Sequence, residues 1–327
     1  MRNGPIDTVR VGMVGAGGLA NIAHYPSLAA MPDVEIVGIA ELNAERLQAT
    51  ADKYDVAGRY RDFRELVARE KPDAVYAIMP PQYLHNLVVD LLELGVHVFV
   101  EKPPALTTYQ TEALAWYADR HDRLTMVGFN RRYIEMLRRC RTAITERGPL
   151  HQCLTGFHKF EGRPDGYGYG RGAGSHLTTD IVHSVDSMRW MAGGEVASVA
   201  ADNRAVDMPF VNNHNALVTF STGCTAILTA SRRSGRRDHY FEMHGQGVSA
   251  FSDDQWRATI YRDGAADGES IDAAEVGGGS EVIYRFGFFA ENRHFIDSIK
   301  AGRQPDTCFA DAVKTMDLVD RIMQSQI

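Results

Sequence analysis

The feature that most constrains the fold is a glycine-rich turn directly after a short β-branched run. Residues 8–14 resemble a strand, and Gly15-Ala16-Gly17-Gly18-Leu19-Ala20 follows, matching G-x-G-x-x-A before a helical stretch that stops at Pro32. The first glycine permits a tight turn, the second lets a pyrophosphate approach the backbone, and the small third residue allows close helix–strand packing. The helix N-terminus adds N–H groups and partial positive charge. The pattern therefore predicts a dinucleotide site.

The rest of the first 127 residues alternates apolar runs of strand length with helical stretches. Strands are expected at residues 34–40, 73–79, 96–100 and 124–127, and helices after Asn43 and over 84–94 and 107–121. Strands alternating with helices imply a parallel sheet with right-handed crossovers. Residues 1–127 are therefore predicted to form an α/β Rossmann domain with a doubly wound parallel sheet.

An acidic residue, Glu41, ends the second predicted strand, 21 residues after Ala20. A carboxylate at this place can accept hydrogen bonds from the adenosine ribose hydroxyls and would repel a 2′-phosphate. The sequence therefore favours NAD over NADP. The alternative is an ordinary solvated glutamate at the start of a loop.

Residues 128–327 have a different pattern. Short strands recur from about Cys153, at 196–201, 215–220, 225–230, 240–244 and 256–261, and Gly, Asn and Asp separate several of them. This pattern is typical of a large, mostly antiparallel open sheet. We therefore expect a second, α+β domain over residues 128–327.

One helix of this second half carries acid–base residues. Over residues 176–191, Asp180 and His183 are three apart and share a helix face. A carboxylate beside an imidazole can fix its tautomer, which suits a general base that takes a proton from an alcohol. Asp186 is expected to be structural, paired with Arg189. No third ligand at a recognised spacing accompanies the Asp-x-x-His pair, so no metal site is expected.

Several motifs together resemble the glucose–fructose oxidoreductase / inositol dehydrogenase (Gfo/Idh/MocA) family. They are the glycine turn, His85 after Pro80-Pro81, the run Gly95-Val96-His97-Val98-Phe99-Val100-Glu101-Lys102-Pro103, and Gly128-Phe129-Asn130-Arg131-Arg132-Tyr133. The resemblance covers nearly the whole chain. It implies that the second domain binds substrate and forms an oligomer, with a homodimer or homotetramer expected.

Lys102 is the first residue to which the resemblance assigns catalysis. It is expected at the carboxyl end of a parallel strand, where open α/β sheets bind ligands. An ammonium there can donate to a substrate hydroxyl and stabilise the developing alkoxide. The resemblance also implies cofactor contacts for Pro80, His85, Glu101 and Arg131. For Arg131 the alternative is a solvated helix start.

The site helix departs from the family pattern, which is Asp, any residue, Gly, any residue, His. The position four before His183 is Thr179, the glycine position is Ile181, and the carboxylate is displaced to Asp180. Either Thr179 or Asp180 therefore fills the substrate position before His183.

Two further segments allow two interpretations each. The glycine-rich stretch 161–174 contains Tyr167 and Tyr169, which would suit a lid over a sugar ring or an exposed loop. The arginines around Ser234-Gly235 suit a charge-protected sheet edge, which we favour, or an anionic substrate group. They are Arg232, Arg233, Arg236 and Arg237.

Composition limits the remaining classes. The 327 residues carry a net charge of −7, which argues against a nucleic-acid partner. Four separated cysteines without a C-x-x-C pair favour a reduced, cytoplasmic protein. No apolar run is long enough for a membrane helix, and Asp7 and Arg10 interrupt any signal-like N-terminus. The acidic total conceals a basic segment, residues 128–237, with 15 basic and 9 acidic side chains.

The leading interpretation is an NAD(P)-dependent oxidoreductase acting on a secondary alcohol or ketone. The resemblance implies that its substrate is a sugar, inositol or related polyol. An alternative from the same family is an NAD-dependent glycosidase that oxidises a hydroxyl transiently, eliminates the aglycone, adds water and reduces the ketone again. The least favoured alternative is a non-catalytic NAD-binding regulator, because Lys102 and His183 are both retained.

Overall fold

Two units make up the chain in the computed structural model, which describes residues 7–161, 174–253 and 256–326. The first unit is Met1–Gly128 with Phe288–Val313, and the second is Phe129–Gly287 with Lys314–Ile327. The sequence predicted a single division at residue 128, so residues 288–313 differ from that expectation. They join the first unit because helix α10 (Phe288–Ala301) packs on α1 and β1. Tyr167 and Tyr169 lie outside the described residues.

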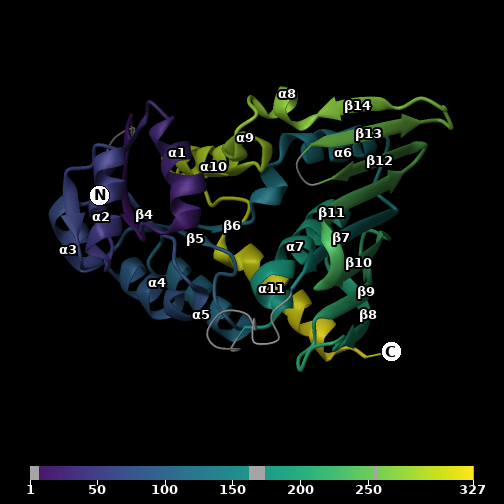
Figure 1. Cartoon of the computed structure of the whole chain (residues 1–327), viewed down its shortest axis with the longest axis horizontal. Helices are drawn as coiled ribbons and strands as arrows, with labels where there is room; N and C mark the ends of the chain where they lie inside the picture. The colour runs from purple at the N-terminus through teal and green to yellow at the C-terminus, as the bar shows by residue number, and fades with distance from the viewer. Residues whose placement is uncertain (1–6, 162–173, 254–255, 327) are drawn as a thin grey trace. The chain divides into compact units, whose positions relative to one another are not determined.

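The first unit contains a six-stranded sheet in the order β3-β2-β1-β4-β5-β6 (Figure 1). Every neighbouring pair is parallel, and the order is that of a doubly wound Rossmann sheet, which confirms the predicted fold class. The strands are β1 (Val9–Val14), β2 (Val34–Ala40), β3 (Gly58–Tyr60), β4 (Ala74–Ala77), β5 (His97–Glu101) and β6 (Thr125–Gly128).

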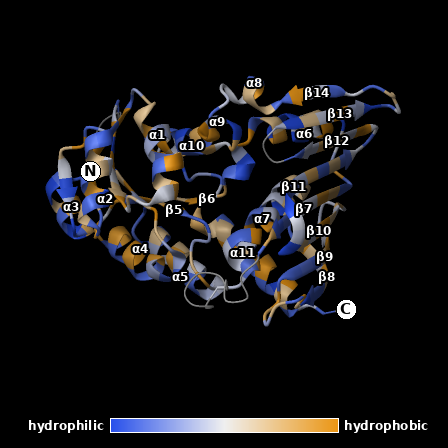
Figure 2. Cartoon of the chain, viewed as in Figure 1, coloured by the Kyte–Doolittle hydropathy of each residue, from blue (hydrophilic) through white to orange (hydrophobic). Residues whose placement is uncertain are grey.

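Helices connect these strands, and two predicted caps are confirmed. Asn43 accepts a hydrogen bond from the Arg46 N–H at 2.9 Å, and Gly95 ends its helix with φ +81°. The helices are η1 (Ala20–His24, π-helical), α1 (Tyr25–Ala29), α2 (Ala44–Lys53), α3 (Phe63–Glu70), the 3-10 turn η2 (Pro81–Tyr83), α4 (Leu84–Glu93) and α5 (Thr108–Arg120). In Figure 2, α4 is more strongly apolar than the largely polar α3.

The core of the first unit is built from strands buried along their whole length, β4 and β6 among them. Tyr76 of β4 stacks on Phe99 of β5 with their ring centroids 4.5 Å apart, and Phe295 of α10 packs on both rings. This aromatic layer ties α10 to the centre of the sheet, which explains why a segment from the end of the chain belongs to the first unit.

The second unit contains an eight-stranded sheet in the order β14-β13-β12-β11-β7-β10-β9-β8. All its neighbouring pairs are antiparallel except β7 with β10, so the mostly antiparallel sheet is confirmed. Its strands are β7 (Gln152–Phe160), β8 (Val196–Arg204), β9 (Asn213–Phe220), β10 (Thr225–Ser231), β11 (Arg233–Gly245), β12 (Val248–Asp253), β13 (Arg257–Arg262) and β14 (Glu269–Asp272).

Helices of the second unit cover part of this sheet. Helix α7 packs against β7 and β10, and α6 packs against β11, β12 and β13. The helices are the 3-10 turn η3 (Asn130–Tyr133), α6 (Glu135–Thr145), the π-helical η4 (Leu177–Ile181), α7 (Val182–Ala192), α8 (Ala273–Gly277), α9 (Val282–Arg285) and α11 (Phe309–Gln324), which begins in the first unit and ends in the second.

Candidate functional site

The glycine turn after β1 has the backbone that its sequence predicts. Gly15 has φ +104°, and a Cβ there would lie 2.2 Å from the carbonyl oxygen of Ile78, so the protein itself requires glycine. The Tyr25 hydroxyl donates to the Gly15 carbonyl at 3.1 Å. A Cβ on Gly17 or Gly18 would meet nothing within 4 Å. The chain's own packing therefore does not require those two glycines, which agrees with the close approach of a pyrophosphate that the sequence predicts.

A cavity of about 650 Å³ opens beside this turn in the first unit. It is lined by the carboxyl ends of β1, β2 and β4 and the segments that follow them, where open α/β sheets bind ligands. Gly15, Gly17, Glu41 and Pro80 contribute, whereas Ala20 is fully buried under the turn and Leu19 is exposed. The lining fits an elongated dinucleotide better than a compact metal site.

Glu41 is fixed at one end of this cavity. Its Oε2 accepts the Ala16 N–H at 2.9 Å, and its Oε1 accepts the Asn43 N–H at 2.9 Å. The carboxylate therefore bridges the glycine turn and the N-cap of α2 instead of pointing freely into solvent. Three cations also line the cavity, which the sequence reasoning did not single out: Arg46, Arg61 and Arg64.

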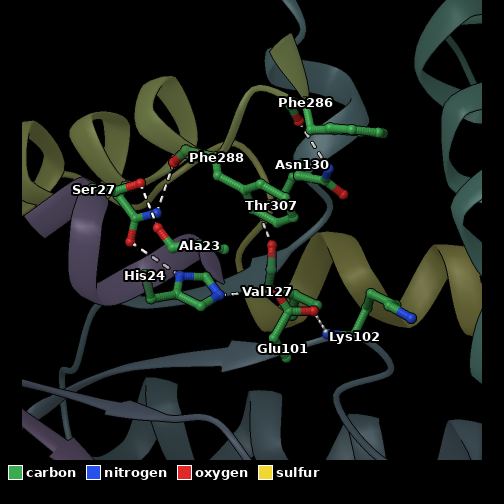
Figure 3. A network of polar contacts seen from close by, with 11 residues as sticks. Ala23, His24, Ser27, Glu101, Lys102, Val127, Asn130, Phe286, Phe288 and Thr307 are labelled. Atoms are coloured by element: carbon green, nitrogen blue, oxygen red, sulfur yellow. Dashed lines mark hydrogen bonds and ion pairs between the residues drawn. The ribbon is translucent and has the colours of Figure 1, made fainter. Parts of the chain in front are cut away.

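Glu101 and His24 form a buried pair beneath Lys102 (Figure 3). His24 Nε2 lies 3.0 Å from Glu101 Oε1, and His24 Nδ1 lies 3.3 Å from Asn292 Oδ1. The other Glu101 oxygen accepts the Lys102 backbone N–H at 3.1 Å. The sequence reasoning missed His24, although it lies on the helical stretch that follows the glycine turn. The pair fixes the backbone from which the Lys102 side chain extends.

His85 lies in the first turn of α4, soon after Pro80. It is half-buried, with its Nδ1 3.1 Å from the Asn86 amide oxygen. His85 is not among the residues that line the cavity described above, although Pro80 and Tyr83 are. Its predicted cofactor contact stays a prediction.

The predicted acid–base residues of the second unit lie on consecutive turns, η4 and α7. Thr179 is buried and its hydroxyl donates to the Ser175 carbonyl at 2.8 Å. His183 is 9% exposed in the first turn of α7. Asp180 has two cationic partners that the sequence reasoning did not name: its Oδ2 accepts from Lys159 Nζ at 2.6 Å and from Arg232 Nη2.

Asp186 is structural, as predicted, but its main partner is different. It forms a bidentate pair with Arg132, at 2.7 Å to Nε and 2.6 Å to Nη2, whereas Arg189 Nη1 lies 3.9 Å away. Thr315 of α11 also donates to it at 2.8 Å. Arg132 and Asp186 are 54 residues apart, so no spacing pattern in the sequence links them. Only the nearby Arg189 could be inferred as a partner of Asp186.

The two arginines of η3 are buried, which excludes the solvated helix start. Arg131 is 6% exposed and its Nη2 lies 3.2 Å from His239 Nδ1. The favoured edge or interface at the later arginines stays a prediction: β11 lies between β7 and β12, but its pairing with β12 begins only at Tyr240. The register between β11 and β7 shifts from Arg233 to Asp238, which places the polar residues between them in an irregular stretch.

The described residues contain neither a metal-binding cluster nor a membrane-spanning helix. Among them there is no group of three or more His, Cys, Asp or Glu side chains arranged to hold a metal ion. Nor does any helix in the described part of the chain have the length and apolarity needed to span a membrane.

Both units match models of one protein family. Residues 9–129 match "Oxidoreductase family, NAD-binding Rossmann fold", and residues 148–250 match "GFO/IDH/MocA C-terminal domain". The chain belongs to the Gfo/Idh/MocA family of oxidoreductases. The family resemblance inferred from the motifs is thereby confirmed, and so is an NAD-binding Rossmann domain.

Proteins of this family with named substrates are similar to the chain over nearly its full length. An inositol 2-dehydrogenase of Rhizobium meliloti (strain 1021) is 24% identical, covering 97% of each chain. A levoglucosan dehydrogenase, solved with NADH and levoglucosan, has a TM-score of 0.85 at 18% identity and 97% coverage of each chain. KijD10, a 3-ketoreductase from Actinomadura kijaniata solved with NADP and TDP-benzene, has a TM-score of 0.81 at 22% identity and 98% coverage. The two structures show the same fold.

Proposed function

We propose that the protein is an NAD-dependent dehydrogenase or reductase that acts on a secondary alcohol or ketone of a sugar, inositol or related polyol. The observation that carries the proposal is the cavity at the carboxyl ends of β1, β2 and β4. Lys102 follows β5, the strand next to β4 in the same sheet, and its backbone N–H is held by Glu101. The family's dehydrogenases and the names of the similar proteins support a CH–OH substrate.

The bound nicotinamide would supply the acceptor or donor for a hydride. Lys102 would donate a hydrogen bond to the substrate oxygen and stabilise its developing negative charge as the C–H bond breaks. His183 would accept the hydroxyl proton, acting as general base in oxidation and as general acid in reduction. Both roles follow from the residue types and their resemblance to family positions.

The remaining site residues have supporting roles in this proposal. Gly15, Gly17, Gly18, Leu19 and Ala20 form the turn for the pyrophosphate, and Pro80, His85 and Arg131 contact the cofactor. Thr179 and Asp180 lie before His183 on η4 and are the candidates for substrate contact. The Thr179 hydroxyl already donates to a backbone carbonyl, so it remains able to accept a hydrogen bond. Tyr167 and Tyr169 stay predicted sugar contacts.

We assign NAD rather than NADP on the position of Glu41, which would repel a 2′-phosphate beside the turn. Arg46, Arg61 and Arg64 line the same cavity and would attract a 2′-phosphate. The preference for NAD therefore depends on the Glu41 carboxylate. Glu41→Ser should therefore move the ratio of kcat/KM values for NAD and NADP toward NADP by at least about tenfold. An unchanged ratio in steady-state kinetics would contradict the assignment, and Glu45→Ser, on the exposed face of α2, is the control.

Assembly into a homodimer or homotetramer in the cytoplasm completes the proposal. Large apolar side chains are exposed on the outward face of the eight-stranded sheet, at Phe160, Leu217 and Phe251. Such a face commonly marks an interface. Sedimentation of the protein at micromolar concentration tests this, because a monomer would contradict it.

A panel of sugars, polyols and aryl glycosides tests the proposed activity, with reduced nicotinamide and products both measured. Oxidation of a polyol with matching NADH supports the dehydrogenase. Glycoside cleavage without net NADH would instead favour transient oxidation, and no turnover of any kind would favour a regulator.

Lys102→Met should lower kcat/KM about 10²- to 10³-fold while NAD still binds. Unchanged activity in that variant would remove Lys102 from the mechanism.

A further inference from the structure

Five basic side chains gather in the second unit, four of them around one phenylalanine ring; we call the five the basic cluster. They are Arg131, Lys159, Arg232, Arg237 and His239. Phe157 of β7 stacks on His239 of β11 with centroids 3.8 Å apart. Three of the cations lie 4.8 to 5.8 Å from the centroid of the same ring. Side chains from two strands, the β10–β11 link and η3 therefore converge on a single position.

Burial makes this gathering of positive charge costly. Arg131 is 6% exposed and Arg232 is 5% exposed, and each guanidinium removed from water loses several kcal/mol of solvation. The buried Nε of Arg232 finds no hydrogen-bond acceptor among the described residues. A buried N–H without an acceptor is uncommon in native proteins and calls for an explanation. A bound acceptor group would provide one.

Like charges are also brought together within the cluster. The Nη2 atoms of Arg131 and Arg237 lie 3.2 Å and 3.0 Å from the same nitrogen, His239 Nδ1. Both guanidinium groups are donors only, so His239 Nδ1 must be the acceptor, and His239 adds no positive charge in that state. Two arginines thus share one neutral acceptor, and an oxyanion beside them would accept charge-assisted hydrogen bonds from both.

Asp180 is the carboxylate that faces Lys159 and Arg232. One of its oxygens accepts from both Lys159 and Arg232. Lys159 nevertheless has a lowered pKa, because burial disfavours its charged form and Arg232 and Arg131 repel it. The side chains of Lys159 and Asp180 are 29% and 25% exposed, so this side of the cluster remains accessible to a ligand.

We propose that the basic cluster binds an oxyanion group, a carboxylate or a phosphate, on the polyol substrate. The substrate of the proposed dehydrogenase would then be an acidic sugar or polyol, not a neutral one. Asp180 acts in this arrangement as a positioning residue that holds Lys159 and Arg232 ready for the anion. This inference rests on the proposed function for the reaction, but the binding of the oxyanion can be measured without turnover.

The first experiment measures binding, as the shift in melting temperature of the NAD-loaded protein. Glucuronate and glucose 6-phosphate are compared with glucose, and gluconate with glucitol. We expect the anionic member of at least one pair to stabilise the protein, and the glucuronate and phosphate arms identify which oxyanion is preferred. Equal shifts for anionic and neutral members, or no shift with any anion, would overturn the inference.

Variants then test whether the cluster is responsible. Lys159→Met removes the accessible cation while leaving Arg232 with Asp180, and it should weaken binding of the preferred anion at least tenfold. Lys159→Arg should restore most of that binding. Arg236→Gln is the matched control, because Arg236 is exposed on the same stretch of β11 and lies outside the basic cluster. Equal binding in Lys159→Met and the native protein would contradict the proposal.

The same variants separate this inference from its alternatives. If Lys159→Met raises the Kd for NAD in the absence of sugar, the cluster serves the cofactor and the inference fails. If the panel shows efficient oxidation of neutral polyols with no preference for anionic ones, the inference fails while the proposed dehydrogenase stands. If an anionic sugar binds but no nicotinamide is ever reduced, the dehydrogenase fails while the oxyanion site stands.

Discussion

At the scale of single residues, the position of Lys102 depends on side chains that lie far from it in sequence. Glu101 holds the Lys102 N–H with one oxygen and faces His24 with the other, at 3.1 and 3.0 Å. His24 is fully buried and comes from the helix after the glycine turn. The turn that receives the cofactor and the strand that carries the lysine are thus coupled within the first unit by one carboxylate.

Gly128 allows this coupling, which gives a prediction. A Cβ on Gly128 would lie 2.9 Å from Glu101 Oε1, so Gly128→Ala must displace the carboxylate. We expect kcat/KM to fall about 10- to 100-fold, because small misplacements of a catalytic group are costly. Gly235→Ala is the control, since its Cβ would meet nothing within 4 Å. Native kinetics in a folded Gly128→Ala protein would show that Glu101 does not position Lys102.

Residue patterns in the sequence identified the local features of the site and missed the long-range ones. The glycine turn, Glu41 and Lys102 each lie beside a strand end that periodicity reveals. The partners of Asp180 come from β7 and from the β10–β11 link, 21 and 52 residues away, and no spacing rule connects them. The same limit explains why Asp186 was paired with Arg189 and not with Arg132.

At the scale of elements, the sequence predicts long and strongly patterned segments best. The strands of the first sheet and the helix at 84–94 agree with β1, β2, β4, β5, β6 and α4 within a few residues. The sequence did not predict β3, β12 or β14; β3 has three residues and β14 has four, which is too few for a clear period. Both π-helical turns, η1 and η4, directly precede or contain candidate site residues, which sequence periodicity could not indicate.

A buried ion pair joins η3 to α7, and its removal should cost stability. Asp186 is 1% exposed, so Asp186→Ala would leave the Arg132 guanidinium buried without its carboxylate. We expect the free energy of unfolding, measured with urea, to fall by about 3–5 kcal/mol. Asp263→Ala is the matched control, because Asp263 forms a similar two-bond pair with Arg147 at the surface. A loss no larger than that of the control would contradict the expectation.

At the scale of the whole molecule, the chain does not divide into two consecutive segments. Residues 288–313 return to the first unit, and α11 passes from one unit to the other. The first family match covers residues 9–129, and the boundary that the sequence placed after residue 127 stays a prediction. The sequence could not predict that residues 288–313 belong to the first unit, because the aromatic contacts of Phe295 with Tyr76 and Phe99 join residues about 200 positions apart.

Each unit contains a histidine that resists protonation, the half-buried His97 in the first unit and the buried His214 in the second. Burial, with Arg123 nearby, lowers the pKa of His97 to about 4, and burial, with His176 and Arg232 nearby, lowers the pKa of His214 to about 4. An unfolded histidine titrates near 6.5, so the unfolded state binds protons first as the pH falls. Stability should therefore be level above about pH 6.5 and fall by up to about 1.4 kcal/mol per pH unit per histidine between about 6.5 and 4.

Urea unfolding at several pH values between 7.5 and 5 measures this slope. His214→Gln should reduce the slope, because one of the two histidines is removed. A free energy of unfolding that does not change across this range would show that neither histidine stays neutral in the folded protein.

The central claim, net hydride transfer to a nicotinamide, is tested most directly by stoichiometry. NADH and the oxidised product are quantified in one reaction with the best substrate from the panel. The account predicts one NADH for each ketone formed, with both lost in Lys102→Met. Product formed by bond cleavage, with a ratio of NADH to product near zero, would contradict it.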